Sequence, residues 1–197
     1  MSDLMASLTV VTKPASEPVT LAEAKEHLKV PADITAEDTL IQGFVSAARE
    51  QVEQLTWRAV MSQSLRLVLD RWPEPFRLPR PPLIQIDSIK YYDASGVLQT
   101  LDSSNYRLID GDNAALYPIS RWPNLSNRQD AVTVNFQAGH QSSGDVPESI
   151  KAAILLFVGH LYNNREDVKA DTPELRTFHL LISPHRFRDL QVPTVNI

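Results

Sequence analysis

The chain has 197 residues, 43% of them hydrophobic and 22% charged, and is long enough to bury a core without disulfides or structural metals. It contains no cysteine, which excludes thiolate nucleophiles, iron–sulfur clusters, cysteine-ligated zinc and disulfide frameworks. With 24 acidic and 19 basic residues its formal net charge is -5, which argues against a surface that grips nucleic acid through the phosphates.

The sequence shows no basic segment followed by an apolar core, and no apolar run of about 18 residues. We therefore expect a soluble protein that is made in the cytoplasm and has no membrane partner. No internal repeat or low-complexity tract interrupts the chain, so we expect one domain, or one domain with an insertion.

Residues 1–61 are predicted to form an N-terminal helical part. Thr20 and Glu23 have the spacing of a capping box, in which each side chain binds an amide of the first helical turn. This helix is predicted to end near Leu28, and a second helix to begin near residue 35 or 36. The second helix carries apolar side chains at three- and four-residue steps, which is typical of a helix that packs on its own core. They are Leu40, Ile41, Phe44, Val45, Ala48, Val52 and Leu55.

Residues 62–140 are predicted to form an inserted, antiparallel β-rich part. Leu65, Leu67 and Leu69 alternate with other residues, as a half-buried strand requires. The apolar phase changes between Ile86 and Ile89, which predicts a bulge near Ser88. The proline-rich stretch that follows Trp72 predicts a stiff connection at a sheet edge. Further short strands, joined by tight turns, are predicted at residues 106–109, 115–117 and 132–136.

Residues 141–182 are predicted to form a C-terminal helical part that completes the core. One helix should run from Pro147 to about Asn163, and a short one from 173 to 182. The centre of the first helix is apolar on nearly every side, which indicates burial within the core or between subunits. The candidate residues for a subunit interface are Ile154, Phe157, Val158 and Leu161.

Residues 183–197 are predicted to form an extended C-terminal arm, because two prolines interrupt any regular helix there. The apolar side chains of the arm would be unfavourable in water and therefore indicate a partner surface. The predicted fold class is thus α+β, with a helical bundle core made by the N- and C-terminal helices. The antiparallel β-rich region is inserted between those helices, and the arm follows them.

Candidate catalytic groups are scattered rather than grouped. His160, alone on an apolar helix, is more typical of a core or interface group than of a metal ligand. Residues 110–113 (DGDN) favour a tight hairpin turn over a calcium loop, which needs further oxygen ligands. Glu23 and Lys25 have a spacing found in some nuclease sites, yet they lie on an amphipathic helix without other acidic ligands. With no phosphate-binding loop or nucleophile elbow either, we predict no catalytic, metal or cofactor site and no enzymatic activity.

Four arginines and two aromatic residues lie close together in the middle of the chain. Such a group could neutralise and stack a single nucleic acid strand. A solvated strand face or a protein contact is the favoured interpretation. The residues are Arg66, Arg71, Trp72, Phe76, Arg77 and Arg80.

The order and spacing of several segments resemble those of the head–tail connector proteins of tailed bacteriophages. The first group comprises residues 19–28 (VTLAEAKEHL), 47–58 (AAREQVEQLTWR), 69–73 (LDRWP) and 78–83 (LPRPPL). The second group comprises residues 134–139 (VNFQAG), 146–156 (VPESIKAAILL), 160–166 (HLYNNRE) and 180–186 (LLISPHR). The resemblance rests on the ordered set and covers roughly residues 19 to 187.

The resemblance implies a ring of identical subunits, commonly twelve, that docks under the capsid portal and lines the channel through which DNA leaves the head. The implied partners are the portal protein, a tail-side connector or tail-terminator protein, and DNA that passes without specific binding. The chain would be made in the bacterial host cytoplasm and reside in the neck of a phage or of a domesticated gene transfer particle. In such connectors the C-terminal segment contacts the portal, which assigns portal docking to the arm. Its candidate residues are Pro184, Phe187, Arg188, Leu190, Val192, Val195 and Ile197.

Two other functions remain open at this point. A tail-completion or tail-terminator protein would also form a ring, but it would bind tail-tube subunits. A small phage nuclease or hydrolase would require converging carboxylates or a metal site.

Overall fold

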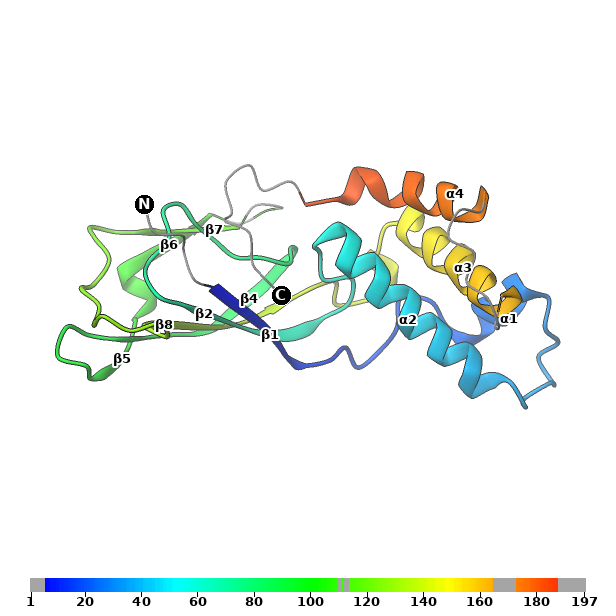
Figure 1. Cartoon of the computed structure of the whole chain (residues 1–197), viewed down its shortest axis with the longest axis horizontal. Coiled ribbons are helices and arrows are strands. Elements are labelled where there is room, and N and C mark those ends of the chain that lie inside the picture. The colour runs from blue at the N-terminus through cyan, green and yellow to red at the C-terminus, as the bar shows by residue number, and fades with distance from the viewer. Residues whose placement is uncertain (1–5, 110, 112–113, 165–172, 188–197) are drawn as a thin grey trace. The chain divides into compact units, whose positions relative to one another are not determined.

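The computed structural model describes residues 6–109, 111, 114–164 and 173–187. Within these ranges the chain forms two compact units. Residues 6–13 and 62–139 form a β-rich unit, and residues 14–61 and 140–187 form a helical unit. The coloured trace in Figure 1 follows the chain from a blue strand into the helices, back through the green strands and into the last helices. The predicted combination of helices with antiparallel β-structure is therefore confirmed.

The described part of the helical unit contains four α-helices, at the positions that the sequence predicted. None of the helices within the described ranges is both long and apolar enough to span a lipid bilayer. All four contribute to one hydrophobic core. They are α1 (Leu21–Leu28), α2 (Asp38–Thr56), α3 (Glu148–Asn163) and α4 (Pro173–Ile182).

The predicted capping box at the start of α1 is confirmed. The Thr20 hydroxyl accepts a hydrogen bond from the Glu23 amide at 3.2 Å, and the Glu23 carboxylate accepts one from the Thr20 amide at 2.7 Å. These bonds satisfy amides that the first turn of a helix leaves unpaired. Hydrogen bonds from the Thr20 side chain and amide lower the pKa of Glu23, because they stabilise its ionised form.

The segment between α1 and α2 is held by a buried lysine. The Lys25 ammonium donates to the carbonyls of Ala32 and Ile34, at 3.1 and 2.8 Å, and to the Asp38 carboxylate at 2.8 Å. Three acceptors therefore compensate the cost of burying this charge, whose residue is only 5% exposed. The second helix begins at Asp38, slightly later than predicted, where its carboxylate meets this ammonium.

The apolar helix α3 lies at the centre of the helical unit and packs against α1, α2 and α4. This position explains why its sequence is apolar on nearly every side. Ile154 and Val158 have no exposed surface within one copy of the chain. Their assignment to a subunit interface was therefore wrong, because neighbouring helices of the same unit already cover them.

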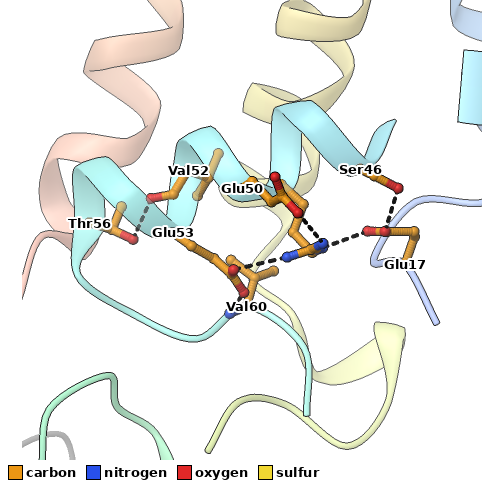
Figure 2. Close-up of polar contacts among 8 residues, drawn as sticks. Glu17, Ser46, Glu50, Val52, Glu53, Thr56 and Val60 are labelled. Atoms are coloured by element: carbon orange, nitrogen blue, oxygen red, sulfur yellow. Dashed lines mark hydrogen bonds and ion pairs between the residues drawn. The ribbon is translucent and has the colours of Figure 1, made fainter. Parts of the chain in front are cut away.

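A network of charged side chains joins α2 to the segments on both sides of it (Figure 2). The guanidinium of Arg49, a residue 4% exposed, donates to Glu17 at 2.8 Å and to Glu53 at 2.9 Å. The second oxygen of Glu53 accepts from the Val60 amide at 2.8 Å, and the second oxygen of Glu17 accepts from the Ser46 hydroxyl at 2.7 Å. One arginine thus links the chain entering the helical unit to the chain leaving it.

The β-rich unit holds two antiparallel sheets. The larger has the strand order β1-β2-β8-β4-β5, and the smaller has the order β3-β7-β6. The strands of the larger sheet are β1 (Ala6–Thr12), β2 (Gln63–Leu69), β8 (Val132–Ala138), β4 (Leu83–Tyr92) and β5 (Leu98–Thr100). Those of the smaller sheet are β3 (Phe76–Arg77), β7 (Ala115–Pro118) and β6 (Tyr106–Ile109).

The strand patterns read from the sequence are confirmed. Leu65, Leu67 and Leu69 are buried in β2 and pair with the buried Phe136, Val134 and Val132 of β8. The pairing of β4 with β8 shifts register between Ile86 and Ser88, where the bulge was predicted. A further shift lies between Leu83 and Gln85.

Strand β1 corrects the predicted boundary of the N-terminal helical part. Residues 6–12, part of the predicted helical segment 1–61, pair antiparallel with β2 and belong to the β-rich unit. Leu8 lies opposite Leu67, a residue more than fifty positions away. A pairing between residues so far apart cannot be recognised from the local sequence. The only local sign of this edge strand is a short run that includes β-branched residues.

We predict that Thr20→Ala lowers the free energy of unfolding by about 1 kcal/mol, the usual cost of losing a helix cap. It should also raise the pKa of Glu23 toward its ordinary value, because that carboxylate loses the hydroxyl donor and keeps only the backbone amide of residue 20. Glu23 has a lower pKa in the folded protein than in the unfolded chain, so its ionised form stabilises the folded protein at pH values above the unfolded-state pKa. This stabilisation is lost as the pH falls through the folded-state pKa of Glu23. The free energies of unfolding of Thr20→Ala and of the wild type should therefore converge as the pH falls, which denaturation at several pH values would show. An NMR titration would give the pKa of Glu23 in both proteins. Thr39→Ala, at an exposed position of α2, should leave the Glu23 titration unchanged.

We predict that Glu53→Gln lowers the free energy of unfolding by about 3 kcal/mol, because the buried Arg49 loses the charge of one of its two close carboxylate partners and keeps only Glu17. Glu50→Gln is the matched control on the same helix, since Glu50 lies 3.6 Å from the same guanidinium but its side chain is 53% exposed. The control should change stability by less than about 0.5 kcal/mol. Equal effects of the two substitutions in urea denaturation would contradict the central role given to Arg49.

Candidate interaction surfaces

The candidate catalytic residues are occupied by structural contacts. Glu23 caps α1 and Lys25 holds the segment before α2, so this pair does not face a common site. Asp110 and Asp112 lie outside the described residues. Across the described ranges, no three His, Asp or Glu side chains come together in a way that would hold a metal ion.

Two aspartates of the β-rich unit serve its turns. The Gln99 side chain, together with the Val97 and Ser95 amides, lowers the pKa of Asp93. The pKa of Asp102 is lowered in the same way by hydrogen bonds from Ser104. A lowered pKa keeps a carboxylate ionised, which suits a hydrogen-bond acceptor in a turn and does not suit a general acid near neutral pH.

The aromatic residues that could stack nucleic acid bases are used inside the β-rich unit. Trp72 stacks on Trp122 with ring centroids 4.7 Å apart, and its indole N–H donates to the Pro123 carbonyl at 2.9 Å. Phe76 is 1% exposed, and its ring is tilted relative to Trp72 and edge-on to Trp122. Tyr91 of β4 also contacts Trp72, so this cluster links the two sheets. A structural role for these rings is thereby favoured over base stacking.

The segment after α4 differs from the predicted extended arm in its first residues. Ser183–His185 form a 3-10 turn, because Pro184 sits near its start, where its missing amide and fixed φ are tolerated. Three contacts hold this segment to the helical unit. The Phe187 amide donates to the Thr56 carbonyl at 2.7 Å, and Arg58 Nε donates to the His185 carbonyl at 2.6 Å. The His185 ring nitrogen Nε2 lies 2.7 Å from the Ser149 hydroxyl.

These contacts hold the backbone of Phe187, the last residue that the structure describes, against the helical unit. The other candidate docking residues of the arm lie outside the described residues: Arg188, Leu190, Val192, Val195 and Ile197. Pro184 therefore belongs to the anchored turn, and of the predicted docking residues only Pro184 and Phe187 lie within the described part of the chain.

Two of the four candidate interface residues keep exposed surface. Phe157 is half-buried, and its ring lies 5.1 Å from that of Phe178 in α4. Leu161 is half-buried one turn further along α3. Both therefore lie at the border between the core and the surface of the helical unit.

The most exposed large apolar side chains were not singled out from the sequence. Leu180 of α4 is 72% exposed and Ile119 after β7 is 66% exposed. Leu180 sits two positions from both Phe178 and Ile182, which are buried, so it points away from the core. A leucine on the polar side of an amphipathic helix was the available signal. Ile109 and Tyr117, on neighbouring strands, are also exposed.

Comparisons with known proteins identify the fold. The sequence matches no family model and no curated protein. The structure is similar to a chain in the neck of an empty gene transfer agent particle, computed with C6 symmetry, with a TM-score of 0.79 and 24% identity over 94% of this chain and 97% of that chain. A chain in the virion of a native gene transfer agent particle gives a TM-score of 0.79 and 26% identity over 93% and 97% of the two chains.

A third similar chain comes from the neck of a native gene transfer agent particle, computed with C12 symmetry. Its TM-score is 0.76, with 23% identity over 94% of this chain and 97% of that chain. At this level of identity the likeness establishes a shared fold. It agrees, over nearly the whole length, with the resemblance to head–tail connectors drawn from the sequence.

Proposed function

We propose that the chain is a non-enzymatic structural subunit of the neck of a tailed-phage-like particle, the adaptor that joins the capsid portal to the tail. The observation that carries this proposal is the match to chains of gene transfer agent necks and virions across 93–94% of this chain. A match of that length supports a neck role for the chain as a whole.

The subunits form a closed ring in this proposal, most simply of twelve copies. Two of the similar chains belong to necks that were computed with C6 and C12 symmetry, which supports this arrangement. A ring uses a heterologous interface, in which one surface of each copy contacts a different surface of the next. Phe157 and Leu161 remain candidates for that interface because both keep exposed area.

DNA passes through the ring without specific binding in this proposal. The formal net charge of -5 supports a conduit, because a strongly basic lumen would hold the phosphates by releasing their counterions. Trp72 and Phe76 also support passage of DNA without specific binding, because their rings pack on other aromatic rings inside the β-rich unit instead of stacking on bases.

The two protein partners are the portal on the head side and a connector or terminator protein on the tail side. We assign portal docking to the arm after Phe187. The anchored turn at Ser183–His185 would give each arm a fixed origin, so that identical arms could reach equivalent sites around a portal ring. The assembled protein would reside in the particle neck after synthesis in the bacterial host cytoplasm.

The first test is the mass of the purified protein alone and after mixing with a portal ring, by native mass spectrometry and sedimentation. We expect a ring that is stoichiometric with the portal. A protein that ignores portals and assembles on tail tubes would instead be a tail-completion protein. A protein that binds neither would contradict a neck function and reopen the search for a hydrolase or nuclease activity.

We predict that deleting residues 188–197 abolishes portal docking and leaves the thermal unfolding of the protein unchanged, because the contacts of His185 and Phe187 remain. In the full chain, the pair Leu190→Asp and Val195→Asp should weaken docking, since charges would replace apolar contacts. Gln191→Asp with Asn196→Asp is the matched control, with the same added charge at polar positions. Undiminished portal binding by the truncated protein would show that the arm is not the docking element.

A further inference from the structure

We draw no further inference here: the strongest candidate, the outer edge of strand β1 in the larger sheet, where Val10 is 47% exposed although it lies opposite the buried Leu65, carries none because nothing in the structure shows which chain covers it.

Discussion

The buried guanidinium of Arg49 is the constraint on which the helical unit depends. Glu17 and Glu53 hold it, and Glu53 also holds the Val60 amide, so one charge fixes the chain shortly after it enters the unit and shortly before it leaves. The last turn of α2 extends this role, since the Thr56 carbonyl accepts the Phe187 amide. Because a buried arginine without its carboxylates is strongly unfavourable, these positions are fixed together and do not vary independently.

A structural subunit needs surfaces at fixed positions, and the polar chemistry of this chain is used for that purpose. Lys25 orders the segment between α1 and α2, Thr20 and Glu23 cap α1, and His185 contacts Ser149 just before the end of the described residues. These groups are satisfied by contacts within the fold. Satisfied polar groups hold the surfaces that they support in one conformation, and such preorganisation would lower the cost of the ring contacts that we propose.

Much of the fold was accessible from sequence because its signals are local. The Thr20–Glu23 spacing predicted the start of α1, the alternation of Leu65, Leu67 and Leu69 predicted β2, and the phase change before Ile89 predicted the bulge. Strand β1 was missed because its evidence is a partner more than fifty residues away. The first residues of the arm were misjudged because proline is tolerated at the start of a short helical turn as well as in extended chain.

The sequence by itself determined the identity of most helices and strands, the absence of cysteine chemistry and the acidic balance of the chain, since these depend on composition and on short-range periodicity. Only the tertiary structure decided which side of each helix is covered. Ile154 and Leu180 are both aliphatic residues on helices of the same unit, yet one has no exposed surface and the other is 72% exposed. Burial depends on the neighbours that surround a side chain in space, and periodicity within one helix indicates the covered side without showing which neighbours cover it.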